Sequence, residues 1–586
     1  LYVTTNNQFS SSDYIEFYGE MNDGKPDSLL YKTPSDQPST VKSLFTDSAT
    51  FFLTLDPFSI NARMQQQNND ISFTPTPEQY CFYTSYAYTG PATQTNVLNR
   101  GFPVAPFLPQ LYNSDFDPGE GWCIGPFDNT GYTGVYNDVL NNGGWVSFKK
   151  LYQDPAVNAT FTFAVLSNDG VHRLRTIING KIDTIQNYLG PIVKRDIYQI
   201  GSQFLNESGN AIQLYELNNG SGIANTLLSV VMVYPRKFSF ENRSSAIFSI
   251  KKPDDLYFEV KDFNTVSTTP ILYDIKNKQR YLGVVDSVLK FHLTATVLNK
   301  ESLYLSAQDA NSIPNINLLT PISFTNFLNA SQQGNYLIIS NKKLKNSSNG
   351  IDNVEEYRKY RSSIQGGGYN AKVYYIDELN DQFGYGIVQH PLAIRNFINF
   401  AYDKFATRPQ LLYIIGKGFE YNYNLGNQNN INRSLVQTYG EPASDVLLTA
   451  RSGALNYPQI GVGRLAAITG DDVRLYLDKV KEYESILNDT FCVSETPFNK
   501  LWMKNVLHLG GGNTNFEQQQ FRGYLDNYKA VIEAPKFGAL SGSGRGACPR
   551  LAGQQIPYLV TSLTRYRDNT GVRSELSVFL VCRKQG

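Results

Sequence analysis

Cysteine, histidine and tryptophan are scarce in this sequence, with 5 Cys, 4 His and 3 Trp among 586 residues. The cysteines are dispersed and form no CxxC pair, at Cys81, Cys123, Cys492, Cys548 and Cys582. No histidine is spaced from a cysteine as a zinc ligand would be. The sequence therefore gives no support for a structural zinc site.

Long apolar runs and an excess of one charge are also absent. No stretch approaches the roughly 18 to 20 consecutive apolar residues that a membrane-spanning helix needs, so we expect no transmembrane segment. Lys plus Arg equals Asp plus Glu at 52 each, which gives no overall field for a nucleic-acid partner. The sequence opens at Leu1 without a charged and apolar leader. We therefore expect an export signal upstream of it.

Abundant aromatic residues and a period of two characterise the first half of the chain. The length suits two to four domains, and aromatics make up 13%. In LKFHLTATV the apolar residues alternate with polar ones, which predicts a strand with one core face (Leu289, Phe291, Leu293, Ala295 and Val297). TFTFAVLSNDGVHRLRTIING predicts two further strands around the turn 167–170. We predict all-β sandwich or barrel modules, one over 1–130 and further β-sandwich structure over 131–325.

The pattern changes after about residue 325 to apolar strands that alternate with amphipathic helices. The predicted strands are YLIIS (336–340), KVYYID (372–377), LLYIIG (411–416) and NVLHLG (505–510). Helices are predicted from Val354, Pro391, Asp472 and Thr514, the last with Glu517 at capping-box spacing. Strands that are apolar on both faces predict a mainly parallel sheet covered by helices over 326–539, with sites at the carboxyl ends of the strands.

The last 47 residues, from Leu540, differ in composition from the rest. They contain six arginines and one lysine, against 17 and 28 in the preceding residues, and two of the cysteines. One interpretation is a basic, partly disordered tail that binds an acidic partner. The other, which we favour, is that 540–586 do not belong to the fold, as after a shift of reading frame.

Glycine-rich and acidic stretches suggest nucleotide or metal sites, but their spacing is wrong. Gly416-Lys417-Gly418 lacks the Ser or Thr that a P-loop places after its lysine. A dinucleotide loop from Gly510 would require glycine where Asn515 stands. The acidic stretch 115–120 lacks the spacing of an EF-hand loop and is interpreted as a solvated turn. We assign no cofactor-binding and no metal-binding residues.

Thiol catalysis would need a thiolate, a nearby imidazole base and backbone donors for the oxyanion. His508 follows an apolar strand and is the natural suspect for the base. No cysteine follows a recognisable strand after it, and Cys492 lies in a predicted loop before that strand. We interpret His508 as a strand-end residue.

An ordered series of motifs resembles the gingipain-type (C25 family) cysteine peptidases. It comprises GNYLIIS, YRSSIQGGGYNAKVYYIDELNDQFGYG, HPLAIRNFINFAY, PQLLYIIGKG, PASDVLLT, PQIGVGRLAAIT and KNVLHLGGG. The segment DYIEFYGEMNDGKPDSLLY resembles the β-rich front of the PorU-like members, which are surface proteins of the type IX secretion system in Bacteroidetes-like bacteria. The resemblance spans roughly residues 1 to 538. It implies β modules followed by a partial caspase-like α/β domain.

The resemblance also implies a catalytic pair, and the sequence departs from the family's pattern at that point. The family's catalytic histidine lies in a Gly-His-Gly loop, and its cysteine ends the following strand; Gly-His-Gly occurs nowhere in this sequence. We therefore assign no catalytic residue and expect an N-terminal fragment of a peptidase or sortase, inactive as it stands. Protein substrates, other type IX secretion components and a place outside the cell or on the outer membrane are implied. The analogy allows calcium without assignable ligands. The alternative is a surface or adhesion protein with a non-catalytic α/β scaffold.

Overall fold

The chain forms two compact units of unequal size. The computed structural model describes residues 2–3, 10–11, 13–54, 63–72, 74–87, 97–98, 114–127, 132–136, 148–218, 225–265, 269–309, 313, 316, 319–424, 428–451, 457–488, 505–509, 514–536, 539–544 and 577–578. The larger unit combines Leu1–Phe102 with Tyr112–Asp478, and the smaller one combines Pro103–Leu111 with Lys479–Gly586. No helix in the described ranges is long and apolar enough to cross a membrane.

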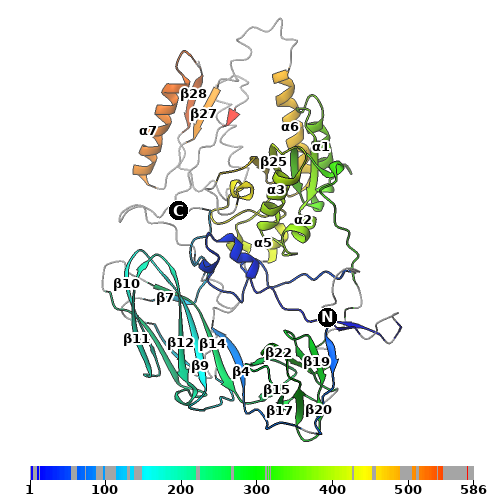
Figure 1. The fold of residues 1–586 in the computed structure, drawn as a ribbon. Helices are drawn as coiled ribbons and strands as arrows, with labels where there is room; N and C mark the ends of the chain where they lie inside the picture. The colour runs from blue at the N-terminus through cyan, green and yellow to red at the C-terminus, as the bar shows by residue number, and fades with distance from the viewer. Residues whose placement is uncertain are drawn as a thin grey trace. The chain divides into compact units, whose positions relative to one another are not determined.

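Mainly antiparallel sheets build most of the larger unit's first 310 residues (Figure 1). The largest sheet has the order β12 (Val193–Gly201), β9 (Asn158–Ser167), β14 (Asn225–Arg236), β4 (Cys81–Ala87), β16 (Ser245–Ile250), β22 (Lys300–Ser306), β18 (Ile271–Asp274), β19 (Gln279–Leu282) and β3 (Gln65–Gln67), with β7 (Gly125–Phe127) also on β14. A second sheet has the order β11 (Ile182–Gly190), β10 (Gly170–Ile178), β13 (Asn210–Glu216) and β8 (Tyr132–Tyr136). A third has the order β15 (Ser239–Arg243), β17 (Leu256–Phe263), β21 (Leu289–Leu293) and β20 (Val284–Val285). The pairs β3–β19 and β15–β17 are parallel. The all-β front predicted from the alternating pattern is confirmed.

Two of these sheets form a sandwich with a common core. Phe161 and Phe163 of β9 and Met232 of β14 pack in one cluster with Leu174 of β10 and Leu214 of β13. The turn predicted at 167–170 is present, but it does not close a hairpin. It carries the chain from β9 in one sheet to β10 in the other, so the two strands pair with different neighbours.

Strand β21 ends earlier than the alternating pattern predicts. Leu289, Phe291 and Leu293 are buried as expected, whereas Ala295 and Val297 are exposed. The backbone amide of Thr296 donates to the carbonyl of Pro253 instead of continuing the ladder. The alternation therefore continues for four residues beyond the strand that it predicts.

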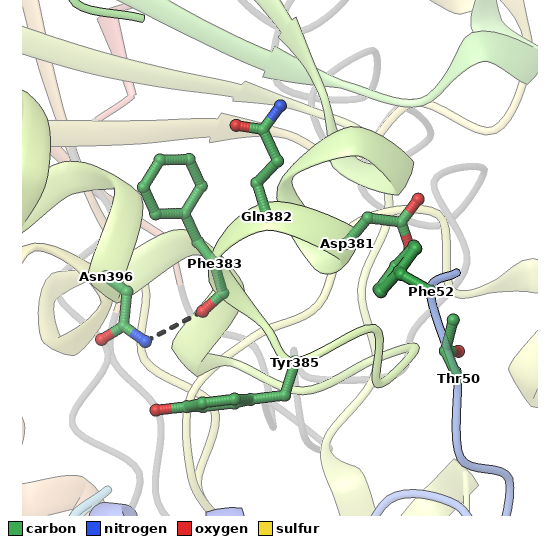
Figure 2. Close-up of a pocket in the computed structure, with 7 residues that line it drawn as sticks. All are labelled: Thr50, Phe52, Asp381, Gln382, Phe383, Tyr385 and Asn396. Atoms are coloured by element: carbon green, nitrogen blue, oxygen red, sulfur yellow. Dashed lines mark hydrogen bonds between the residues drawn. The ribbon is translucent and has the colours of Figure 1, made fainter. Parts of the chain in front are cut away.

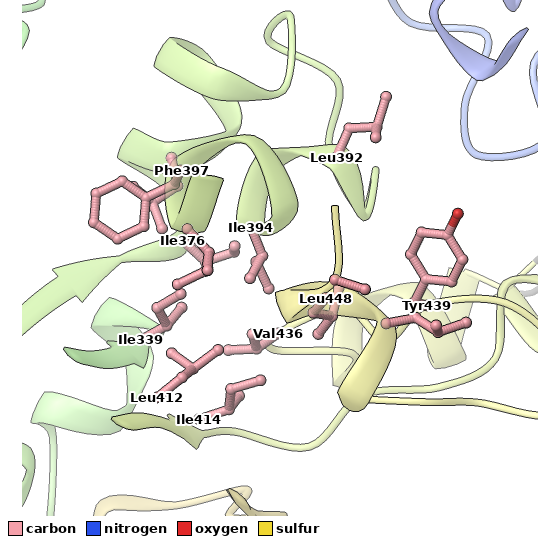
Figure 3. Packing of buried hydrophobic residues seen from close by; sticks show 14 of the residues in the cluster. Ile339, Ile376, Leu392, Ile394, Phe397, Leu412, Ile414, Val436, Tyr439 and Leu448 are labelled. Atoms are coloured by element: carbon pink, nitrogen blue, oxygen red, sulfur yellow. The ribbon is translucent and has the colours of Figure 1, made fainter. Parts of the chain in front are cut away.

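A parallel four-stranded sheet forms the core of the α/β part. Its order is β24 (Ala371–Tyr375), β23 (Tyr336–Ser340), β25 (Leu411–Ile415) and β26 (Gly461–Leu465). Its helices are α1 (Asn353–Ser362), α2 (Ile376–Phe383), α3 (Leu392–Lys404), α4 (Tyr421–Asn424), α5 (Gln428–Arg433) and α6 (Gly470–Asn488). Leu337 and Ile339 enter one hydrophobic cluster and Tyr336 and Ile338 the other, because alternate residues of a strand face opposite sides. Figure 3 shows Ile339 in the first cluster, together with Leu412 and Ile414 of β25. The predicted parallel sheet with both faces covered is confirmed.

The N-terminal segment packs into this α/β core rather than into a β module of its own. Leu30, Leu44, Phe116 and Trp122 belong to the same buried cluster as α3. In residues 13–54 the structure shows only the two-residue strand β2 (Ile15–Glu16) and the 3-10 turns η1 (Lys25–Leu30) and η2 (Pro34–Asp36). The predicted module over 1–130 is therefore divided: β4 joins the largest sheet, while the segments around 22–47 and 114–123 cover the α/β domain.

The smaller unit carries the predicted strand around His508. Parallel strands β28 (Leu540–Gly544), β27 (Asn505–Leu509) and β29 (Ser577–Val578) pair in that order, and α7 (Asn515–Ile532) connects β27 to β28. The predicted boundary of a separate tail at residue 540 is contradicted, because Leu540 to Gly544 form a strand of the fold. The arginine-rich stretch beyond Gly544 lies mostly outside the described residues.

Candidate functional site

A functional site is expected at the carboxyl ends of the parallel strands. A segment of the chain, here called the crossing segment, covers this edge of the sheet. The crossing segment comprises residues 434–439 and runs over the ends of β23 and β25. Asn341 donates from Nδ2 to the carbonyl of Leu435, at 2.9 Å. Ser340 donates to the carbonyl of Ile415, at 3.0 Å. The last side chain of β23, Ser340, and the side chain that follows it, Asn341, are therefore both engaged in holding this edge together.

The Gly416-Lys417-Gly418 turn is filled by the same segment. The amides of Gly416 and Lys417 donate to the carbonyls of Leu465 and Ala467. A Cβ added at Gly418 would lie 2.4 Å from the carbonyl oxygen of Val436. Because these amides already have acceptors, the turn cannot offer them to a phosphate, which agrees with its interpretation as a tight connection after a strand. The glycines 510–512 lie outside the described residues.

Arg464 fastens the crossing segment to the sheet. Its Nε and Nη2 donate to the carboxylate of Asp445 at 2.7 to 3.0 Å. Its remaining donors reach the carbonyls of Gly416, Val436 and Gln437 at 2.8 to 2.9 Å. The planar guanidinium group can donate to all of these acceptors at the same time. This arrangement gives Arg464 a structural role.

Arg464→Lys is expected to destabilise the sheet edge by about 1–3 kcal/mol, because an ammonium cannot reach this set of acceptors and leaves carbonyls unpaired. Hydrogen exchange of β25 and β26 measures the loss. Arg451→Lys is the matched control, since Arg451 forms an exposed ion pair with Asp403. Equal exchange in the two variants would contradict the role of Arg464.

His390 forms a buried pair with Asp27 of the N-terminal segment. Its Nε2 lies 3.2 Å from Asp27 Oδ1, and both side chains are fully buried. Its Nδ1 accepts from the backbone amide of Leu392 at 3.2 Å, so Nε2 carries the hydrogen and donates to Asp27. Asp27 also accepts from Ser43 Oγ and from the amide of Leu44. With both ring nitrogens occupied, His390 has no lone pair for a substrate proton.

Glu120 lies next to this pair and is fully buried. Tyr421 donates to its Oε1, and the amide of Asp117 donates to its Oε2 at 3.0 Å. Burial raises the pKa of Glu120 to about 8, and these two hydrogen bonds offset only part of that rise. The interpretation of 115–120 as a solvated turn is therefore wrong: its last carboxyl group is packed against α4.

The cluster around Glu120 and His390 joins distant parts of the sequence. The two residues of the Asp27–His390 pair are 363 positions apart, and those of the Glu120–Tyr421 pair are 301 positions apart. Phe45 contacts both rings, with centroids 4.6 Å from His390 and 6.2 Å from Tyr421. No periodicity or spacing in the sequence links Asp27, His390 and Tyr421.

His172 is engaged through both ring nitrogens. Nδ1 lies 2.9 Å from Glu216 Oε2, and Nε2 lies 2.8 Å from the carbonyl of Asn168. Both partners are hydrogen-bond acceptors, so neither ring nitrogen is left open to another group. Its side chain and that of Glu216 are fully buried, and the ring stacks on Tyr188. His172 therefore has a structural role within the sandwich.

The two remaining histidines of the sequence are His292 and His508. The ring nitrogens of His292 face the carbonyl of Asp70 and the carboxylate of Asp255, at 2.6 and 2.9 Å. Burial lowers the pKa of His292, but these two partners outweigh it and the net direction is upward. His508 is buried on β27 opposite Ser543. Its predicted role as a strand-end residue stays a prediction.

Neither cysteine that the structure describes has the surroundings of a reactive thiol. Cys81 is buried in β4 and donates to the carbonyl of Arg236 at 3.5 Å. Burial raises the pKa of Cys81 to about 12 and that of Cys123 to about 11. A nucleophilic cysteine needs a lowered pKa instead. Cys492, Cys548 and Cys582 lie outside the described residues. The described part of the chain contains no group of three or more His, Cys, Asp or Glu side chains placed to hold a metal ion.

Comparisons with known proteins give one family and several distant folds. Residues 329–556 match the model of peptidase family C25. The crystal structure of dimeric latent PorU from Porphyromonas gingivalis is 12% identical with a TM-score of 0.42, over 77% of this chain and 44% of that chain. The CBM36-1 domain of a multidomain xylanase from the hindgut metagenome of Trinervitermes trinervoides is 18% identical with a TM-score of 0.11, over 17% of this chain and 84% of that chain.

A family two carbohydrate esterase from Clostridium thermocellum, solved with cellohexaose, is 7% identical with a TM-score of 0.14, over 56% of this chain and 90% of that chain. The chain thus spans less than half the length of the PorU chain that it resembles. No curated protein matches.

Proposed function

We propose that this chain is part of a gingipain-type cysteine endopeptidase, since residues 329–556 belong to peptidase family C25. The family match carries this proposal. It falls on the parallel α/β part of the chain, whose strand ends are where such a fold places its site. The substrates of the intact enzyme are proteins or peptides.

The proposed chemistry is acyl transfer through a thiolate. A cysteine attacks the peptide carbonyl, an imidazole takes the thiol proton and returns it to the leaving amine, and backbone amides hold the oxyanion. We assign none of these roles to His172, His292 or His390, because their ring nitrogens are all engaged. Cys81 and Cys123 are equally unsuited, because burial keeps both thiols protonated.

The 586 residues are proposed to be inactive by themselves. The resemblance places the family's catalytic histidine in a Gly-His-Gly loop, and this tripeptide is absent from the sequence. In this proposal the domain core and its N-terminal cover are present, and the reactive pair is supplied by sequence that these residues do not include.

A finer proposal is a sortase of the PorU-like kind, exported to the cell surface. The N-terminal segment 13–31, on which the resemblance to that group rests, packs on the α/β domain through Leu30 and Tyr31. Such an enzyme would remove C-terminal sorting signals from type IX secretion cargo. Its partners would include other components of that system.

Purified residues 1–586 are expected to hydrolyse no peptide in a thiol-dependent manner. A fluorogenic peptide mixture, with and without iodoacetamide, measures this. The matched comparison is the longer protein that the same gene would encode together with its downstream sequence. This protein should hydrolyse the peptides, and iodoacetamide should abolish its turnover. Turnover by the 586 residues that iodoacetamide abolishes would contradict the proposed inactivity.

The competing function is a surface or adhesion protein with a non-catalytic α/β scaffold. The engagement of every ring nitrogen of His172, His292 and His390 favours it. A downstream reading frame without Gly-His-Gly and a strand-end cysteine would support the scaffold and defeat the peptidase.

A further inference from the structure

A hollow of about 430 Å³ lies beside the turn that connects α2 to α3. It is lined by residues from the N-terminal segment and from both helices: Thr50, Phe52, Asp381, Gln382, Phe383, Tyr385 and Asn396. Figure 2 shows Phe383 and Tyr385 on one side of the close-up and Phe52 with Asp381 on the other. No residue of this hollow takes part in the proposed catalysis.

Three aromatic residues line the hollow, and two of them, Phe52 and Phe383, are packed against other rings. Phe52 packs edge-on against Phe324, with centroids 5.2 Å apart. Phe383 packs against Phe397 of α3 at 5.3 Å. Because these rings are held by other rings, they are preorganised to receive a flat group or a cation.

The turn presents Tyr385 in a conformation that few such residues adopt. Its φ is +59°, followed by Gly386 at +71°. The amide of Gly386 donates to the carbonyl of Asn380, and its carbonyl accepts from Thr50 Oγ1 at 2.8 Å. These bonds hold the left-handed turn and leave the side chain of Tyr385 about half exposed, at 52%.

Asp381 brings a carboxylate without a partner. Within the described ranges it has neither an ion pair nor a hydrogen bond, because the nearest lysine, Lys342, pairs with Asp377. Burial, and then the negative charge of Asp377, raise the pKa of Asp381. The positive charge of Lys342 opposes this rise only in part. Glu378 is engaged with the amide of Thr325. Among the described residues, Asp381 thus lines the aromatic hollow as a carboxyl group without a direct partner.

We propose that this hollow binds the guanidinium of an arginine on an extended polypeptide. A carboxylate together with aromatic faces is complementary to an organic cation. Arginine fits better than lysine, because its planar group can stack on a ring while donating two hydrogen bonds to one carboxylate. A metal ion is a poor alternative, since a single unpaired carboxylate supplies too few oxygens.

The polypeptide occupant is argued from charge and shape. The hollow is open to the surface along residues 50–52, and Asp377, Glu378 and Asp381 give this face of α2 a negative charge. A basic, extended segment is complementary to that face. The proposal stands apart from the proposed peptidase function, because it concerns binding only and can succeed or fail whether or not the chain hydrolyses peptides.

The test is saturation-transfer NMR on the 586-residue protein with N-acetyl-arginine N-methylamide. N-acetyl-citrulline N-methylamide has nearly the same shape but no charge. The arginine probe should receive about fivefold more saturation than the citrulline probe. Asp381→Asn should abolish this preference. Asp377→Asn, on the same helix but paired with Lys342, is the matched control and should retain it.

Three outcomes would overturn the proposal. Equal saturation of the arginine and citrulline probes on the unaltered protein would show that charge is not recognised. An equal loss in Asp377→Asn and Asp381→Asn would show a diffuse acidic surface only. A lysine probe, N-acetyl-lysine N-methylamide, that binds as well as arginine would refute the choice of a guanidinium. The comparison of probes on the unaltered protein does not depend on the folding of any variant.

Discussion

Glu216→Ala is expected to destabilise the β-sandwich by about 3–5 kcal/mol at neutral pH. Glu216 is fully buried, and its Oε2 lies 2.9 Å from Nδ1 of His172. Although burial alone would raise its pKa, donors from Asn218, Arg173, His172 and Asn225 hold the pKa of Glu216 below its usual value. Removing the carboxylate leaves several buried donors without an acceptor, among them the amides of Arg173 and Asn218 and the side chain of Asn225.

Hydrogen exchange of peptides that cover β10 and β13 measures this loss. It is preferred to a single melting temperature, because a chain of several domains need not unfold in one step. Asp183→Ala is the matched control: Asp183 forms an exposed ion pair with Arg175 of β10, and little change is expected. Protection that is equally reduced in both variants, or unchanged in Glu216→Ala, would contradict this role of Glu216.

We expect the unaltered protein to lose stability as the pH rises from 5 to 8, and we expect Glu120→Gln to abolish this pH dependence. The pKa of Glu120 is about 8 in the folded chain, against its ordinary value of 4.5. Between these values the unfolded chain releases the proton and the folded chain keeps it, so stability falls as pH rises. The full effect is about 5 kcal/mol, from about 1.4 kcal/mol for each pH unit. Glutamine stays neutral and shows no such fall.

The difference in local unfolding free energy between Glu120→Gln and the unaltered protein tests this, measured from pH 5 to pH 8 by hydrogen exchange of peptides that cover residues 114–123 and α4. The variant should gain relative stability as pH rises, because only the unaltered protein must bury a charge or hold a proton. Glu356→Gln, at an exposed ion pair with Lys359, is the control and should show no trend. A difference that is constant with pH would mean that Glu120 is ionised in the fold.

Local pattern located three of the four strands of the parallel sheet, but it missed β26 and the helix α2. The apolar runs at 336–340 and 411–416 became β23 and β25, and Pro391 opened α3 as the spacing of Ile394, Phe397 and Ala401 predicted. Such patterns are local, because the periodicity that marks the buried face of a strand or helix can be recognised within a few residues. Where the pattern extended beyond the strand, as at Val297, tertiary hydrogen bonds decided the end.

The polar cluster could not be predicted in the same way. Nothing near Glu120 in the sequence indicates that it is buried, since its partner Tyr421 is 301 residues away. The acidic turn 115–120 was noticed, but its burial depends on a surface that another part of the chain supplies. The same holds for the hollow at Asp381, whose aromatic wall includes Phe52 from the N-terminal segment.

The sequence by itself determined the order of β modules and a parallel α/β domain, and the resemblance to C25 peptidases. Periodicity encodes these features residue by residue, and the motif series is linear in the chain. Only the tertiary structure decided that β9 and β10 enter different sheets, that the N-terminal segment covers the α/β core, and that Glu120 and His172 are buried. The physical reason is that burial and charge state depend on which distant surfaces meet, and a pattern within one segment does not contain that information.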